Sequence, residues 1–173
     1  MAILPIRKVP DPILREKAKR IKNVDKSVVK LANDMIDTMQ AASGAGLAGP
    51  QVGVPLRIVV IGVPEKEPLV LINPQIVRKS GERIIEEGCL SIPGYIGEVK
   101  RAKSVTAKAL DVKGKEFRIR GKDDILAQAL EHEINHLNGI LYIDELINQD
   151  SFHKIEPKKF STAEEQQSET KTN

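Results

Sequence analysis

Two histidines stand four residues apart in the segment LEHEINHLNG at 130–139, with a glutamate directly after the first. At about 100° per residue, the imidazoles of His132 and His136 lie within about 40° of each other on one face of a helix. Such a pair can share one tetrahedral cation, and the adjacent carboxylate of Glu133 can reach water bound to that cation. The pattern HExxH indicates a metal hydrolase and is widely associated with zinc peptidases. Two histidines that only make hydrogen bonds in the core are the alternative interpretation.

A third ligand must come from elsewhere, because two protein ligands are too few for a catalytic metal site. In one large class of HExxH peptidases a histidine follows the second one by six residues, but here that position holds Tyr142. Cys89 ends a predicted strand in EEGCLSIPG, and one thiolate with two imidazoles leaves a position open for water. Its alternative is an inert buried thiol. Cys89 is nevertheless the strongest candidate, since the other possible ligands stand in segments that look solvated, namely Glu145, Glu156 and His153.

The elements that must position these side chains are short. We expect the HExxH helix to begin at Asp123 or Asp124, which can cap it, and to end near Leu137, before Asn138-Gly139. Helical spacing of apolar residues predicts an earlier helix over 27–42. Strands are expected at 56–63, 69–73 and 82–88, and a hairpin at 104–111 and 116–120. The predicted fold class is α+β, with short, mainly antiparallel strands packed around the central HExxH helix, an N-terminal helix and a C-terminal tail.

Composition narrows the class of protein further. The chain has 173 residues, 40% of them hydrophobic, and a net charge of +3. This suits one catalytic domain over 1–150, followed by a charged tail over 151–173 that we expect to be partly disordered. An aromatic content of 3% argues against modules that stack nucleic-acid bases. A single cysteine, with no stretch of about 20 apolar residues, predicts a cytoplasmic protein without a membrane span or sequence-specific nucleic-acid partner.

Three segments together resemble the peptide deformylase family. GAGLAGPQ at 44–51 is similar to its first motif, GxGxAAxQ, EGCLS at 87–91 matches its second, and HEINH at 132–136 its third. Their order and separation agree with the family, and the resemblance extends to about Ile147. It implies a hydrolase that removes the N-formyl group from the initiator methionine of nascent chains and releases formate.

The resemblance also implies roles for individual residues. It implies one divalent metal ion, typically Fe(II), with Zn, Ni or Co able to substitute. The metal ligands would be Cys89, His132 and His136, with Glu133 as general acid and base. Gln51 and the backbone N–H of Leu90 would stabilise the developing oxyanion. Residues expected around the substrate are Gly46, Ile85, Leu90 and Ala129, which would line a methionine pocket, and Arg101, an exposed-looking base that could hold the substrate backbone or carboxylate.

The chain departs from the family motifs at three positions. Gly49 replaces an alanine and is expected to loosen its loop slightly, whereas Glu131 and Asn135 replace glutamine and aspartate beside the histidines. The last two leave the metal affinity and the rate in question. A zinc peptidase and a catalytically silent protein that binds nascent chains are the competing hypotheses. The basic stretch HKIEPKK at 153–159 also suggests contact with the ribosome, against the alternative of a solvated tail.

Overall fold

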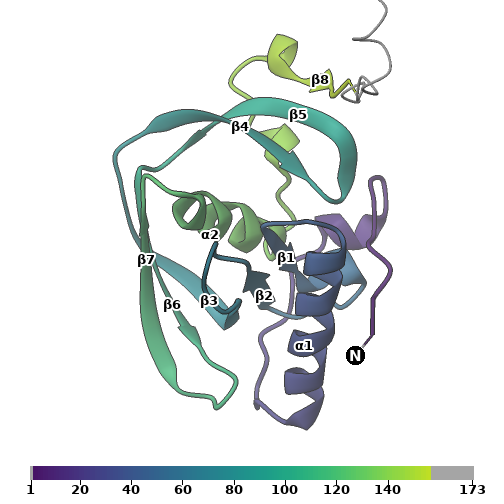
Figure 1. Ribbon diagram of the computed structural model, residues 1–173, viewed down its shortest axis with the longest axis vertical. Helices are drawn as coiled ribbons and strands as arrows, with labels where there is room; N and C mark the ends of the chain where they lie inside the picture. The colour runs from purple at the N-terminus through teal and green to yellow at the C-terminus, as the bar shows by residue number, and fades with distance from the viewer. Residues whose placement is uncertain (1, 157–173) are drawn as a thin grey trace, which may run out of the picture.

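The computed structural model describes residues 2–156, and the charged tail beyond Glu156 lies outside the described residues. Two helices, eight strands and four short 3₁₀ turns make up this part of the chain. Helix α1 covers Lys26–Ala41 and helix α2 covers Ile125–His136. None of the helices among residues 2–156 is long and apolar enough to cross a membrane. The α+β class predicted above, with mainly antiparallel strands around the HExxH helix, is confirmed (Figure 1).

Five of the strands form one antiparallel sheet, in the order β1-β2-β3-β6-β7. They are β1 (Gly46–Ala48), β2 (Ile58–Ile61), β3 (Leu69–Ser80), β6 (Ser104–Leu110) and β7 (Glu116–Lys122). The remaining three form a smaller antiparallel sheet in the order β4-β5-β8. These are β4 (Arg83–Cys89), β5 (Ile92–Arg101) and β8 (His153–Lys154). In Figure 1, α2 lies between the two sheets, below the β4-β5 hairpin.

Strand β2 explains how both helices attach to the large sheet. All four of its residues are buried, which is why the run IVVI shows no polar alternation. Val59 and Ile61 pack in the cluster that contains Leu130 of α2, whereas Ile58 and Val60 pack in the cluster that contains Met35 of α1. Successive residues of a strand point to opposite faces, so one short apolar strand anchors a helix on each face.

Helix α2 begins and ends as its sequence predicts. The Asp124 side chain accepts a hydrogen bond from the backbone N–H of Ala127 at 2.8 Å and caps the first turn. After His136 the chain turns through Gly139, whose φ of +73° is in the left-handed region. The Gly139 Cα also packs against the backbone of Arg15, because an added Cβ would lie 2.8 Å from the Arg15 carbonyl carbon. The C-terminal end of the HExxH helix is thereby fixed to the N-terminal segment.

Most of the predicted elements are present, but their bounds and number differ in part. The predicted strand at 56–63 is shorter, and the one at 69–73 is the start of the longer β3. Strand β5 was not predicted, because Pro93, Gly94 and Gly97 interrupt its pattern. The first residues of the predicted tail, 151–156, contain β8, which pairs with β5. Residues 157–173 lie outside the described part.

Replacing Gly139 with alanine should lower the free energy of unfolding substantially. The left-handed φ alone costs roughly 1–3 kcal/mol for a residue with a Cβ, and the collision with Arg15 adds to it. Gly114→Ala is a matched control, because Gly114 has a φ of +78° and its added Cβ would meet nothing closer than 4.0 Å. Urea unfolding measures both. Equal losses in the two variants would show that the Arg15 contact contributes nothing.

Candidate metal and catalytic site

A cavity of about 410 Å³ opens between α2 and the β4-β5 hairpin. Strand β1 contributes Gly46, the 3₁₀ turn that follows it contributes Gln51, and the end of β4 contributes Cys89. Helix α2 contributes His132 and Glu133 from its last two turns. The three sequence segments singled out by their motifs therefore meet around one cavity, although they are separated by up to about 90 positions in the chain.

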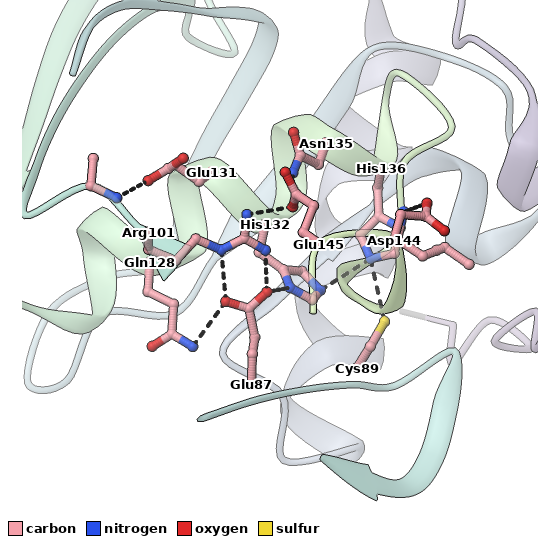
Figure 2. A network of polar contacts seen from close by, with 12 residues as sticks. Glu87, Cys89, Arg101, Gln128, Glu131, His132, Asn135, His136, Asp144 and Glu145 are labelled. Atoms are coloured by element: carbon pink, nitrogen blue, oxygen red, sulfur yellow. Dashed lines mark hydrogen bonds and ion pairs between the residues drawn. The ribbon is translucent and has the colours of Figure 1, made fainter. Parts of the chain in front are cut away.

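Three potential metal donors lie together beside this cavity. The Nε2 atoms of His132 and His136 are 3.1 Å apart, and the Cys89 Sγ lies 3.3 Å from the His136 Nε2. All three donor atoms lie within 4.8 Å of one another. Figure 2 shows the thiol below the His136 ring, and the two imidazole rings are arranged edge to face. One sulfur and two imidazole nitrogens with this geometry fit a divalent transition metal and leave a coordination position free.

Electrostatics also favour a cation at this point. Burial lowers the pKa of His136 well below its usual value, and proximity to His132 lowers it further. Burial opposes protonation of His132 too, but hydrogen bonds to Cys89 and Glu87 raise its pKa well above the usual value. The two neighbouring imidazoles cannot both be in the positively charged form. The three donors together nevertheless favour one positive charge among them. A metal ion placed among the three donors would satisfy that demand.

Glu87, which also lines the cavity, orients His132, and its role was missed in the sequence. Its Oε1 accepts a hydrogen bond from His132 Nδ1 at 2.5 Å, which leaves the Nε2 atom directed at the other donors. Its Oε2 accepts one from Arg101 Nε at 2.9 Å (Figure 2). Burial raises the pKa of Glu87, but the bonds to Arg101 and His132 outweigh it and lower that pKa to about 2. A usable signal existed, because Glu87 and Cys89 are two residues apart on one strand and share a face.

Arg101 does not have the position that its sequence context suggested. The residue is 2% exposed, and its guanidinium group is bound to two carboxylates. Its Nη2 pairs with Glu87, and its Nη1 donates to Glu145 Oε2 at 2.7 Å. The expectation of an exposed Arg101 that holds the substrate is therefore wrong. Glu145 is exposed, as expected, and its carboxylate also belongs to this network.

Three of the four residues expected in the methionine pocket line the cavity, and the fourth does not. Gly46, Leu90 and Ala129 are among the lining residues. Ile85 packs instead against the small cluster that includes Leu14 and Tyr142. It is absent from the described lining of the cavity. The apolar cluster behind β4 explains the difference, since this cluster draws the Ile85 side chain away from the open space.

Glu133 is positioned for proton transfer. The side chain is buried, and burial raises its pKa to about 7, near neutral pH. Its Oε2 atom has no hydrogen-bond partner among the described residues. A Cβ added to Gly46 would lie 2.8 Å from the Glu133 carboxyl carbon, so only glycine leaves room for that carboxyl group. A buried, unpartnered carboxyl group near its titration point can exchange a proton with a water molecule or a substrate.

Gln51 is held with its amide directed at the donors. Its Oε1 accepts a hydrogen bond from the Ala48 backbone N–H at 2.9 Å, and its Nε2 donates to Ser91 Oγ at 3.1 Å and approaches Cys89 Sγ at 3.5 Å. Gly49, between them in sequence, is buried. An added Cβ there would lie 2.5 Å from the Leu56 carbonyl oxygen. The glycine thus permits close packing of the Gln51 turn and does not loosen it.

The two departures beside the histidines point away from the donors. Glu131 Oε1 accepts a hydrogen bond from the Ala102 backbone N–H at 2.6 Å, and Oε2 accepts one from Lys79 at 3.3 Å. Asn135 Nδ2 donates to Glu145 Oε2 at 2.8 Å, beside the Arg101 contact (Figure 2). Glu131 therefore secures the helix to the segment between β5 and β6. Asn135 instead joins the charge network behind His132.

Comparison with known proteins agrees with this geometry. The family model described as polypeptide deformylase matches residues 3–152. A peptide deformylase of Dehalococcoides mccartyi strain CBDB1 is 58% identical over 158 residues, which is 91% of this chain and 94% of the relative. The solved peptide deformylase of Legionella pneumophila is 50% identical, with a TM-score of 0.81 over 84% of this chain and 86% of that one. That of Synechococcus elongatus, solved with actinonin, is 38% identical, with a TM-score of 0.83 over 87% of this chain and 82% of that one. The chain belongs to the polypeptide deformylase family.

Proposed function

We propose that this chain deformylates N-formylmethionyl peptides, the activity of its family, with Cys89, His132 and His136 as metal ligands and Glu133 as general acid and base. These roles are supported by one observation: the three donors and the buried carboxyl group lie together at one cavity. A divalent cation bound by these residues would supply Lewis-acid charge that lowers the pKa of water toward neutrality. Glu87 holds the His132 ring so that its Nε2 stays available as a ligand.

Glu133 performs both proton transfers. The carboxylate takes a proton from the attacking water, and the resulting acid delivers it to the amine nitrogen as the formyl C–N bond breaks. A pKa of about 7 suits both directions, because neither form is then strongly disfavoured at neutral pH. The room left by Gly46 allows the carboxyl group to approach the reacting atoms from the side of β1.

The Gln51 amide and the Leu90 backbone N–H stabilise the negative charge that collects on the formyl oxygen. Both residues line the cavity beside Cys89, and the bond from the Ala48 N–H fixes the Gln51 oxygen so that its NH₂ group is the end that faces the donors. Removing one such donor costs roughly 10²–10³ in rate. Gly46, Leu90 and Ala129 offer an apolar, uncrowded surface for the methionine side chain.

Glu133→Gln should retain the metal and lose turnover. Glutamine preserves the shape of the side chain but cannot take up the proton of water, so formate release should fall by roughly 10²–10⁴. The measurement is formate release from a formyl-Met peptide, with metal content determined on the same sample. Glu86→Gln, an exposed change on β4, is the control. A Glu133→Gln variant that releases formate at the wild-type rate would remove Glu133 from the mechanism.

Asn135→Asp should weaken metal binding, although it restores the residue usual in the family motif. An aspartate at 135 would face the Glu145 carboxylate that now lies 2.8 Å from the Asn135 amide. Repulsion between the two carboxylates would push Glu145 away from Arg101 and weaken the contacts that hold Glu87 and His132 in place. Loss of such outer contacts costs about 10- to 100-fold in metal affinity.

The double variant Asn135→Asp, Glu145→Gln should recover most of this affinity, because the amide and the carboxylate are merely exchanged. Competition with a chelator for Co(II) measures all four members of the cycle. If the changes in metal-binding free energy of the two single variants simply add in the double variant, residues 135 and 145 are not coupled.

We propose Fe(II) as the native metal, with Zn, Ni and Co as substitutes. The donor chemistry alone does not select among these ions, and iron rests on the resemblance of the motifs to the family. Protein purified without oxygen should contain iron and lose activity in air. The Ni- or Co-substituted protein should keep its activity. Zinc as the sole metal in an active anaerobic preparation would contradict this assignment.

We propose the cytoplasm as the site of action, since formylated nascent chains leave bacterial ribosomes there. Contact of the stretch at 153–159 with the ribosome stays a sequence-based hypothesis, because residues 157–159 lie outside the described part. Its support is the charge of that stretch, with three lysines and one glutamate. Equal co-sedimentation of the full chain and a chain ending at Asp150 would exclude it.

A further inference from the structure

The outer face of the large sheet carries a patch of cationic side chains on strands β3, β6 and β7. On the inner face of these strands, apolar side chains such as Ala107 and Ile119 pack in the cluster that contains Leu130 of α2. The side chains that point away from α2 are polar or charged, because successive residues of a strand alternate between the two faces. The strand register places nine of them in three rows, which we call the basic face: Gln75, Lys108 and Arg118; Arg78, Thr106 and Arg120; Ser80, Ser104 and Lys122.

The basic face concentrates the positive charge of the chain. Its nine residues include five cations and no carboxylate, so it carries a charge of +5, whereas the whole chain carries only +3. Within residues 2–156, the only carboxylate within 4.0 Å of one of these cations is that of Glu116, which lies 3.9 Å from Lys108 at the border of the face. Helix α1 packs at the β1-β2 end of the sheet, and in Figure 1 β6 and β7 lie at the far end. Four of the five cations are exposed, namely Arg78, Arg118, Arg120 and Lys122.

The stability of the sheet does not account for this arrangement. Lys108 and Arg118 are directly opposite each other on neighbouring strands, and like charges in that position are destabilising. Charges on an edge strand can prevent unwanted pairing with another chain, and β7 is an edge strand. Arg78 and Lys108, however, lie on β3 and β6, which are paired on both sides. A negatively charged ligand that neutralises the face would explain both the opposed pair and the cations inside the sheet.

The spacing and the kinds of side chain on the basic face suit a phosphate backbone. Residues two apart on a strand are about 7 Å apart, and neighbouring strands are about 4.8 Å apart, so the cations form a regular grid. Three of the five cations are arginines, which bind phosphate oxygens in a bidentate geometry. Arg120 Nε donates to Ser104 Oγ at 2.9 Å, which holds its guanidinium group on the face. Four further side chains can donate to phosphates or bond a ribose 2′-hydroxyl, namely Gln75, Ser80, Ser104 and Thr106.

The composition of the basic face distinguishes between polyanions. None of its nine residues is aromatic or aliphatic, so it lacks the groups that enter a lipid bilayer or stack on unpaired bases. Double-stranded RNA is recognised by its shape, its phosphates and its 2′-hydroxyls, largely without contacts to bases. We propose that the basic face binds the backbone of double-stranded RNA without sequence preference. This site goes beyond the proposed deformylation and shares no residue with the cavity lining, so RNA and a peptide can be bound together.

The test measures the binding of a labelled RNA duplex of about 16 base pairs, the length that double-stranded RNA-binding domains span. Fluorescence anisotropy at several salt concentrations should give a logarithmic salt slope of about −4 to −5 for five neutralised phosphates. The double variant Arg118→Gln, Arg120→Gln should bind about ten- to hundredfold more weakly at about 0.1 M salt, with a slope smaller by about two. The variant Lys17→Gln, Lys30→Gln is the matched control, because it removes two exposed cations that lie outside both sheets. It should change neither quantity.

Further measurements separate loss of binding from loss of folding. Arg118→Gln should not lower the midpoint of urea unfolding, because it removes a charge opposite Lys108. Both double variants should release formate at the wild-type rate. Equal weakening of RNA binding by the control variant would overturn the proposal, as would equal binding of a DNA duplex of the same sequence. Binding to vesicles of phosphatidylcholine and phosphatidylserine without binding to RNA would also overturn it. Absence of formate release from the metal-loaded wild type would instead count against the proposed function alone.

Discussion

The Glu87 carboxylate holds the two halves of the candidate site together. It accepts hydrogen bonds from His132 of α2, from Arg101 at the end of β5 and from Gln128 one turn before His132. Glu87 and Arg101 are both nearly fully buried. Breaking such a pair by removing one partner costs roughly 3–5 kcal/mol, because the other charge is left uncompensated in a dry environment. The orientation of the His132 ring and the attachment of the β4-β5 hairpin to α2 thus depend on one carboxylate.

The two faces of helix α2 have different roles. Ala127, Leu130 and Ile134 pack on the large sheet, while His132, Glu133 and His136 face the hairpin and the cavity. The third donor, Cys89, comes from the small sheet, 43 residues earlier in sequence than His132. A donor set divided in this way exists only after the hairpin has docked on the helix. Metal binding therefore stabilises the assembled chain specifically, because the unfolded chain offers no comparable site.

The residues of the candidate site were predicted from the sequence better than the residues that surround them. HExxH has a fixed helical geometry, so the positions of His132 and Glu133 followed from spacing alone. The β-hairpin at 104–120 followed from alternation and a turn at Gly114. Arg101 was misplaced because a lone basic residue is ordinarily exposed, and two carboxylates from distant segments are needed to bury it. Nor could the order of β8 be foreseen, since a two-residue strand of His and Lys has no apolar pattern and pairs only because β5 offers a free edge.

The arrangement of the cavity has a consequence for where substitutions are tolerated. The three donors and the Glu133 carboxyl group belong to mutually dependent elements, where most substitutions disturb several contacts at once. Ile155 also lines the cavity, but it is exposed and is bound to β5 through its backbone. Backbone pairing tolerates exchange of the side chain. Substitutions of Ile155 should therefore change the surface of the cavity with little effect on the free energy of unfolding.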